Sequence, residues 1–510
     1  MRTTDSDATW GNDRLNSPPD PGLECPFFKD LHSAHLASSN RVSFAAIAAT
    51  TMAMTSYQFP TDFLWGAATS AYQIEGAARE GGRQPSVWDV FSATPGRVFN
   101  RNTGTVANDH YHRYESDVAW MVKLGIKHYR FSISWSRVIP DGRGAVNEPG
   151  MDFYRRLVDC LLANGITPHI TLYHWDTPQA LETRYGSWRS REIVQDFADY
   201  CTAIVQRLGD RVTHWMTLNE IVCFTHMSYD VDKTPPHAPG VRVPRRKDVW
   251  QTSHHALLAH GMGCQAIRAA SPRPCSIALV DNPGVTVPLT ESAADIAAAQ
   301  AAFHTNWVNG GVIFPALTGA YSEIFWQQLG PDAPDMADGD LELIHQPIDA
   351  LGLNIYTGTY VRAADNAQGY ECLEYAKGYP RLHMPWLWVV PDALYWAVRH
   401  VADVLDRPEL PLLITENGCA TQDEKTRQGE VLDSDRIFYL RQSLKSVHRA
   451  VAEGYPLKGY FVWSLMDNFE WAWGYDRRFG ILYNDYRTQE RTPKASFHWY
   501  AECIRQNRVV

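Results

Sequence analysis

The feature of this 510-residue sequence that most restricts its fold is a repeated alternation of short β-prone runs with helix-length segments. The runs recur at intervals of about 40 to 75 residues, and each interval is long enough for a crossover helix and a loop. The pattern predicts an α/β fold, a single (β/α)8 TIM barrel with elaborated βα loops. The eight expected strands are 63–69, 127–132, 167–173, 213–218, 276–280, 350–354, 412–415 and 459–464.

The first 56 residues differ in composition from the rest of the chain. They are rich in Ser, Asp, Asn and Pro and then in Ala and Thr. Their apolar patch, 42–54, is too short to span a bilayer and too far from the N-terminus for an ordinary signal peptide. We expect residues 1–56 to be a disordered extension, with Met54 as an alternative start. From residue 59 to about residue 500 there is no Ser/Gly-rich linker, low-complexity tract or short repeat, which predicts one domain.

The net charge and the cysteine pattern limit which binding partners and which cellular compartment we expect. The net charge is −10 and no basic stripe is present, so nucleic acid and anionic membranes are not expected partners. The scattered cysteines lack CxxC spacing, which predicts reduced, mostly buried thiols in a cytoplasmic protein. The oligomeric state is not fixed by the sequence. The nine cysteines are residues 25, 160, 201, 223, 264, 275, 372, 419 and 503.

Two of the expected strands end on a glutamate with an amide side chain beside it. The run 412–415 leads into Glu416 and Asn417, and the run 213–218 leads into Asn219 and Glu220. One such glutamate is readily explained as an acid beside a turn. Two of them are harder to dismiss, because the C-terminal ends of barrel strands are where α/β barrels carry out chemistry. Such a pair can divide the roles of acid and nucleophile.

Other strands also end on polar or aromatic side chains of the kinds that bind sugars. Each has an ordinary structural explanation when taken alone: a core histidine for His174, an ion pair for Arg130, packing for the tryptophans. Their occurrence on one rim of one barrel favours a binding site. The residues are Gln73, Arg130, His174, Asn354, Tyr356, Trp463, Glu470 and Trp471.

From about residue 59 to residue 500, these motifs resemble glycoside hydrolase family 1, the family of retaining β-glucosidases. The resemblance implies a (β/α)8 glycoside hydrolase catalytic domain over 57–510. It rests on five segments in the family's order: 70–76, 173–176, 217–220 (TLNE), 414–418 (ITENG), and 463–475 followed by 478–480.

The resemblance assigns Glu220 as the acid/base and Glu416 as the nucleophile. It places Arg130 and Asn354 in support of the nucleophile and Trp188 on the aglycone side. No metal and no cofactor is expected. The residues expected to hold the non-reducing sugar are Gln73, His174, Asn219, Tyr356, Trp463, Glu470 and Trp471.

The expected mechanism follows from the chemistry of paired carboxylates. If the two carboxyl groups lie about 5 to 5.5 Å apart, no water fits between nucleophile and sugar, and the reaction proceeds by double displacement with retention. Glu416 must be ionised, and its charge raises the pKa of Glu220. Glu470 favours an unphosphorylated sugar, since a buried carboxylate repels phosphate. A glutamate at position 220 favours O-glycosides over thioglycosides.

The sequence departs from the family at Ile221, where the family usually has Pro, and is only loosely similar over 222–240 and 303–343. We expect these differences to alter aglycone preference more than reaction type. The expected activity is exo-acting hydrolysis of cellobiose, short cello-oligosaccharides and aryl or alkyl β-glucosides, with β-galactosidase or β-fucosidase side activity.

Three alternatives stay open at this stage. A transglycosylating β-glycosidase would use the same residues. A non-catalytic sugar-binding protein could have the same fold, although both carboxylates are retained here. A metal-dependent hydrolase has little support, because no second pair of ligands accompanies His174 and Asp176.

Overall fold

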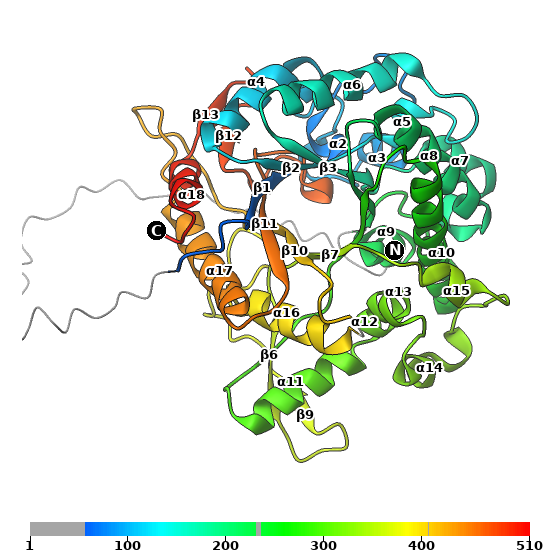
Figure 1. Ribbon diagram of the computed structural model, residues 1–510, viewed down its shortest axis with the longest axis vertical. Coiled ribbons are helices and arrows are strands. Elements are labelled where there is room, and N and C mark those ends of the chain that lie inside the picture. The colour runs from blue at the N-terminus through cyan, green and yellow to red at the C-terminus, as the bar shows by residue number, and fades with distance from the viewer. Residues whose placement is uncertain (1–56, 231–235, 406) are drawn as a thin grey trace, which may run out of the picture. The chain divides into compact units, whose positions relative to one another are not determined.

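The computed structural model describes residues 57–230, 236–405 and 407–510. The expected extension, 1–56, lies outside the described residues. Eight parallel strands close into a barrel (Figure 1), in the order β1-β11-β10-β7-β5-β4-β3-β2. The predicted TIM barrel is confirmed, and each expected strand agrees with an observed one to within two residues at either end. The barrel strands are β1 (Leu64–Ala68), β2 (His128–Ser132), β3 (Thr167–Tyr173), β4 (His214–Asn219), β5 (Ser276–Asp281), β7 (Ala350–Asn354), β10 (Leu412–Asn417) and β11 (Leu457–Trp463).

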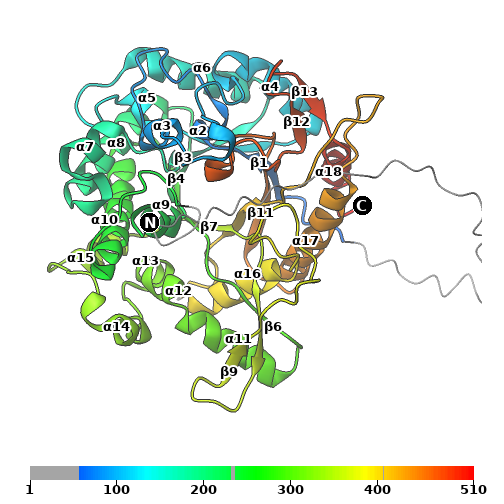
Figure 2. The same ribbon diagram turned by 180° about the vertical axis from the view of Figure 1, so that it is seen from behind.

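Helices surround the barrel in both views (Figures 1 and 2), as expected for crossover connections between parallel strands. The longer ones are α4 (His110–Leu124), α6 (Glu148–Ala163), α8 (Glu192–Leu208), α10 (Arg246–Ala270), α11 (Ala293–Thr305), α16 (Ala393–Val404), α17 (Ser434–Ala452) and α18 (Ala495–Gln506). The shorter ones are α2 (Ala71–Ile74), α3 (Val87–Ala93), α5 (Trp135–Val138), α7 (Gln179–Tyr185), α9 (Ile221–Tyr229), α12 (Trp307–Gly311), α13 (Ile313–Thr318), α14 (Glu323–Leu329) and α15 (Asp340–Ile344).

The βα loops are elaborated, as predicted, and carry two small sheets of their own. One sheet joins β6 (Thr286–Pro288), β8 (Thr359–Ala363) and β9 (Tyr370–Cys372). The other is an antiparallel pair, β12 (Leu482–Asn484) and β13 (Arg491–Pro493), after the last barrel strand. The first of these sheets packs on α11 through a small apolar cluster separate from the main core, formed by Ala298, Ala299, Ala302 and Val361.

Register shifts interrupt two of the barrel strands near their C-terminal ends. In β4 the shift lies between Met216 and Asn219, and in β10 it lies between Ile414 and Asn417. Irregularities of this kind re-aim the side chains that follow them. These are the two strands that lead to the paired glutamates.

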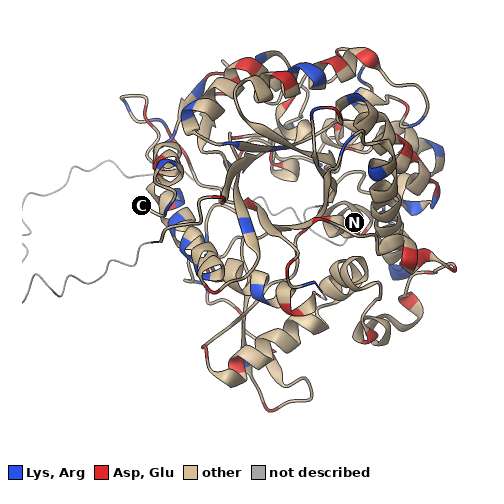
Figure 3. Cartoon of the chain, viewed as in Figure 1, with Lys and Arg blue, Asp and Glu red and all other residues tan. Residues whose placement is uncertain are grey.

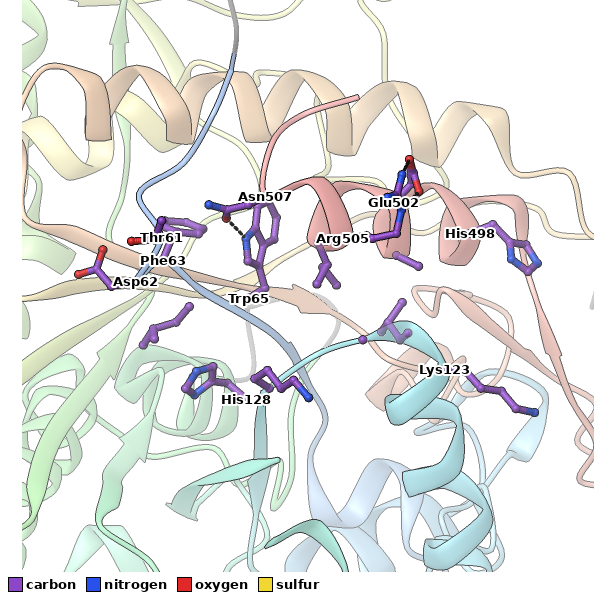
Figure 4. Close-up of a pocket in the computed structure, with 16 residues that line it drawn as sticks. Thr61, Asp62, Phe63, Trp65, Lys123, His128, His498, Glu502, Arg505 and Asn507 are labelled. Atoms are coloured by element: carbon purple, nitrogen blue, oxygen red, sulfur yellow. Dashed lines mark hydrogen bonds and ion pairs between the residues drawn. The ribbon is translucent and has the colours of Figure 1, made fainter. Parts of the chain in front are cut away.

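The opposite end of the barrel holds a second cavity of about 810 Å³ and the junction of the two ends of the domain (Figure 4). The Trp65 indole donates to Asn507 Oδ1 at 2.8 Å, and Asn507 Nδ2 donates to the Phe59 carbonyl at 2.8 Å. The Val509 amide bonds to the Tyr57 carbonyl at 3.2 Å. We refer to these contacts as the terminal clasp.

Three histidines line the N-terminal end of the barrel interior. His128 Nδ1 lies 3.0 Å from His169 Nε2, and the rings of His169 and His214 stack with centroids 4.4 Å apart. Burial lowers the pKa of each of them, that of His128 to about 4. The cluster is therefore uncharged near neutral pH.

The charged residues seen in Figure 3 mix both signs over the outer helices. Within 57–230, 236–405 and 407–510, no helix is both long and apolar enough to cross a membrane. The eight cysteines in these ranges are all free, five of them buried, as expected for reduced thiols.

Candidate active site

Glu220 and Glu416 stand at the C-terminal ends of β4 and β10 and line one cavity of about 430 Å³. Both side chains are buried. Glu220 has a φ of 52°, in the left-handed region, where the chain turns from β4 directly into α9. A left-handed non-glycine residue is strained, and such strain is common at functional sites because the surrounding structure imposes it.

Glu416 is held by a cation and a phenol. Arg130, from β2, donates an Nη1 hydrogen to Glu416 Oε1 at 2.5 Å, and Tyr356 donates its hydroxyl to Oε2 at 2.7 Å. Arg130 is itself fully buried and is oriented by Thr171, which accepts from its Nε at 3.0 Å. Burial raises the pKa of Glu416, and the contacts with Arg130 and Tyr356 oppose that rise.

Glu220 has a different environment. Asn354 Nδ2 donates to its Oε1 at 2.7 Å, and Cys223 Sγ lies 3.1 Å from its Oε2. In the described part of the chain no basic side chain forms an ion pair with it. Burial, and then the charge of Glu416, raise its pKa. Because the cation contacts only Glu416, a proton shared by the pair is expected to reside on Glu220.

Two asparagines link the carboxylates through hydrogen bonds. Asn354 Nδ2 also donates to Asn219 Oδ1 at 3.0 Å, and Asn219 Oδ1 accepts from Arg130 Nη2 at 2.5 Å. Asn354 Oδ1 accepts from the Thr415 hydroxyl at 2.7 Å, and Asn219 Nδ2 lies 3.3 Å from His174 Nε2. The network fixes both carboxylates relative to the barrel strands.

A third carboxyl group, that of Glu470, faces the same cavity from the loop after β11. It is buried, and its Oε2 has no hydrogen-bond partner among the described residues. Burial, with the charges of Glu416 and Glu220, raises its pKa to about 8. A buried carboxyl oxygen with no partner is suited to bind hydroxyl groups of a ligand.

Trp471 and Trp175 line the cavity, and further aromatic rings that do not line it, Trp88, His174 and Trp463, pack around them. The Trp471 ring packs against Trp175 at 4.5 Å and Trp88 at 4.6 Å between centroids. The His174 ring lies nearly parallel to those of Trp463 and Trp471, at 5.8 and 5.9 Å. A cavity with paired carboxylates, an unsatisfied carboxyl group and flat aromatic walls has the chemistry required to hold and cleave a sugar.

Comparison with known proteins decides the family. The family model described as Glycosyl hydrolase family 1 matches residues 55–509. The chain belongs to this family. The motif resemblance and the predicted enzyme class, a retaining glycosidase, are thereby confirmed.

Several relatives align over nearly their whole length. The 1,4-β-D-glucan glucohydrolase of Thermotoga neapolitana is 42% identical over 460 residues, which cover 89% of this chain and 99% of the relative. The bifunctional β-D-glucosidase/β-D-fucosidase of Bifidobacterium breve is 44% identical over 470 residues, 88% of this chain and 98% of the relative. A solved structure, the family 1 β-glucosidase from Thermotoga maritima, superposes with a TM-score of 0.79 at 40% identity and covers 89% of this chain and 99% of its own.

The structure of this family 1 enzyme gathers most of the residues expected at the site. Arg130 and Asn219 lie directly behind the carboxylates. Gln73 is buried further back, donating to Asn468 Oδ1 at 3.0 Å and to the Phe469 carbonyl at 2.9 Å. The expected residues that line the cavity itself are Glu220, Asn354, Tyr356, Glu416, Glu470 and Trp471.

Trp188 requires a correction, because the structure does not bring it to the cavity of the glycosidase. Its side chain is 1% exposed and packs on Tyr173 and Phe224, with centroids 5.1 and 4.8 Å away. Its indole N–H contacts the Tyr173 hydroxyl at 3.1 Å. Trp188 therefore supports the wall from behind and does not line the aglycone side.

Other side chains that line the cavity were not predicted. Trp175 follows His174 directly, and its indole donates to the Asn219 carbonyl at 2.8 Å, so the 173–176 motif already contained it. Cys223 lies one helical turn beyond Glu220, which is a usable signal. Asn282 directly follows β5, and Trp473 and Phe479 lie within the motif segments 463–475 and 478–480, so these three also had a usable signal. The others were not marked by a strand end or a motif: Met227 on α9, and His237, Met384 and Trp386 on loops.

Proposed function

We propose that this enzyme is an exo-acting β-glucosidase. It removes the terminal non-reducing β-D-glucosyl residue from cellobiose, short cello-oligosaccharides and aryl or alkyl β-glucosides, with retention. The observation that carries the proposal is the unequal environment of the carboxylates. Arg130 contacts Glu416, whereas the side-chain hydrogen bonds of Glu220 to described residues are with an amide and a thiol. The glucosidases among its relatives support the choice of sugar.

In the first step Glu416, as the carboxylate, attacks the anomeric carbon while Glu220 gives its proton to the glycosidic oxygen. The covalent ester neutralises Glu416, so the charge that raised the pKa of Glu220 disappears. Glu220, now ionised, takes a proton from water as the water oxygen bonds to the anomeric carbon and the ester breaks. Arg130, Asn219 and Asn354 hold the reacting groups in place through both steps.

Glu470 is proposed to bind the outer hydroxyl groups of the sugar, with Gln73, His174, Trp463 and Trp471 completing its surroundings. A carboxyl group in this position disfavours a phosphorylated sugar. Tolerance of galactosyl and fucosyl residues is a further part of the proposal, and the bifunctional relative from Bifidobacterium breve supports it.

Apolar side chains in the same cavity favour apolar leaving groups. They include Met227, Val285, Met384 and Trp386. An alcohol held there in place of water would accept the glucosyl group, so we also propose transglycosylation as a second outcome of the same chemistry. Free cysteines support a reducing, cytoplasmic compartment.

The test is a pair of alanine variants assayed with p-nitrophenyl β-D-glucoside and azide. Glu416→Ala should be inactive until azide attacks in place of the missing nucleophile, giving α-glucosyl azide. Glu220→Ala should still form the glycosyl-enzyme with this activated leaving group, and azide should then give β-glucosyl azide.

The opposite stereochemistry of the two products makes each variant the control for the other. Melting curves check that both variants fold. Wild-type inactivity on glucosides, galactosides and fucosides alike would overturn the proposal, and so would retained activity in Glu416→Ala.

A further inference from the structure

Cys223 touches the acid/base glutamate and has no role in the mechanism given above. It lies in the first turn of α9 and lines the cavity. Its Sγ is 3.1 Å from Glu220 Oε2, and Asn282 Nδ2 donates to that sulfur at 3.4 Å. The two oxygens of Glu220 thus have different partners, a thiol on one side and an amide on the other.

This difference determines which oxygen carries the proton. Asn354 Nδ2 can only donate, so Oε1, 2.7 Å away, acts as an acceptor and stays unprotonated. The proton of neutral Glu220 therefore resides on Oε2. When Glu220 is ionised, Oε2 is free to accept the thiol hydrogen of Cys223, and the hydrogen from Asn282 directs the thiol proton toward it.

We propose that Cys223 is a positioning residue for the acid/base: its thiol orients Glu220 Oε2 and stabilises the ionised form that activates water. The inference rests on the proposed function. The thiol keeps its own proton throughout. In the first step the proton passes from Oε2 to the glycosidic oxygen, and in the second a proton returns to Oε2 from water, so no other reactant is required.

Few groups oppose the rise in the pKa of Glu220 that burial and neighbouring charges cause. Glu416 from β10 and Asp281 from β5 both raise this pKa, whereas Asn354 and Cys223 lower it. Glu470 adds a further carboxyl group, and Arg130 reaches Glu220 only through Asn219 and Asn354. Since the described residues supply two side-chain hydrogen-bond donors to Glu220, the loss of one should be measurable.

A packing role is the competing explanation, since small buried thiols often only fill space. The variants Cys223→Ala and Cys223→Ser separate the two, because both resemble cysteine in size and only serine keeps a donor. Cys160→Ala, on α6 and remote from the cavity, is the control for loss of a thiol.

The measurement is the pH dependence of kcat/KM on p-nitrophenyl β-D-glucoside, whose alkaline limb reports the pKa of Glu220 in the free enzyme. Removing a donor to the charged form raises that pKa. We expect the limb of Cys223→Ala to move up by roughly 0.3 to 1 pH unit, and kcat to fall several-fold because water activation needs the charged form. Cys223→Ser should restore both, and Cys160→Ala should match wild type.

Identical alkaline limbs in wild type and both Cys223 variants would overturn the inference, and so would a displacement shared equally by alanine and serine. Glu220→Ala is assayed alongside on methyl β-D-glucoside, a poor leaving group. If that variant were fully active, the proposed function itself would fail. If it were impaired while the Cys223 variants were unchanged, only the present inference would fail.

Discussion

Replacing Arg130 by methionine tests what keeps Glu416 ionised. The guanidinium is fully buried and donates to Glu416 Oε1 at 2.5 Å and to Asn219 Oδ1 at 2.5 Å. Methionine preserves much of the volume and removes the charge. Glu416 would then keep Tyr356 as a donor, in a cavity where burial already raises its pKa.

The size of the effect follows from the contact. With charge centres roughly 4 Å apart and an effective dielectric constant of about 20, the attraction is about 4 kcal/mol. That energy corresponds to about three pKa units, and water entering the cavity will reduce it, so we expect the pKa of Glu416 to rise by about one to three. Breaking a buried pair should also lower the free energy of unfolding by about 3 to 5 kcal/mol.

The assay is the acid limb of kcat/KM against pH, which reports ionisation of Glu416 in the free enzyme. The limb should move to higher pH in Arg130→Met. At any pH below the limb, kcat/KM should then fall about tenfold for every pH unit by which the limb has moved. Arg130→Lys keeps the charge and should stay near the wild-type limb, although the forked contact is lost.

Arg137→Met is the matched control for stability. Arg137 is as buried as Arg130 and pairs with Glu75 at 2.9 Å, outside the cavity. This variant should lose comparable stability and keep the wild-type acid limb. If Arg130→Met folded and its acid limb coincided with that of wild type, Arg130 would not be what holds Glu416 in its charged form.

Three further predictions concern the sugar-binding carboxyl group, the histidine cluster and a tightly packed glycine. Glu470→Gln should lower kcat/KM on p-nitrophenyl β-D-glucoside about ten- to hundredfold, because the glutamine amide cannot reproduce both hydrogen bonds of the carboxyl group and a buried polar group left unpaired costs about 1 to 3 kcal/mol. The loss should shrink on deoxyglucosides lacking the bound hydroxyl, and equal losses on all substrates would contradict the role. Burial lowers the pKa of His128 from its ordinary 6.5 to about 4. The folded protein is therefore destabilised by about 3 kcal/mol as the pH falls from 6.5 to 4, because in this range the unfolded chain binds the proton and the folded chain does not. Urea unfolding of His128→Gln should show a weaker dependence of stability on pH than wild type, and an unchanged dependence would refute this. A Cβ at Gly418 would lie 1.6 Å from the Trp463 carbonyl oxygen. Gly418→Ala should therefore lose at least about 1 to 3 kcal/mol of stability and most of its activity. If the variant melted at the wild-type temperature and kept the wild-type kcat/KM, the strand ends would be free to move.

The fold was predictable because each barrel strand is a local pattern. Buried runs such as 412–415 are short, apolar and bounded by turn residues, and their number and spacing leave few architectures. The two glutamates were predictable for the same reason, since each directly follows its strand. Which of the two is the nucleophile came only from the family resemblance, because no local pattern shows that Arg130, from another strand, contacts Glu416.

Residues on long loops mark the limit of prediction from this sequence. Trp188 was expected at the aglycone side, yet the turn after α7 directs it behind Tyr173. Met384 and Trp386 line the cavity from a segment whose path depends on tertiary packing, and neither position has a periodicity or a motif that would reveal it. Asn282, in contrast, directly follows β5 and could have been found from its position at a strand end. Position on a strand end is local information, whereas position on a long loop is not.

The terminal clasp has a consequence for how the enzyme is made. Strand β1 lies between β2 and β11, so one edge of β1 has no hydrogen-bonded neighbour in the barrel until β11, the last barrel strand, has been synthesised. Trp463 and Glu470 also belong to that last portion, so a nascent chain can have neither a closed barrel nor a complete sugar site. Because Tyr57 and Val509 are already hydrogen-bonded, a short peptide joining residues 57 and 510 should be tolerated. A circular permutant opened in an exposed loop would then close its barrel in a different order and reach the same active site.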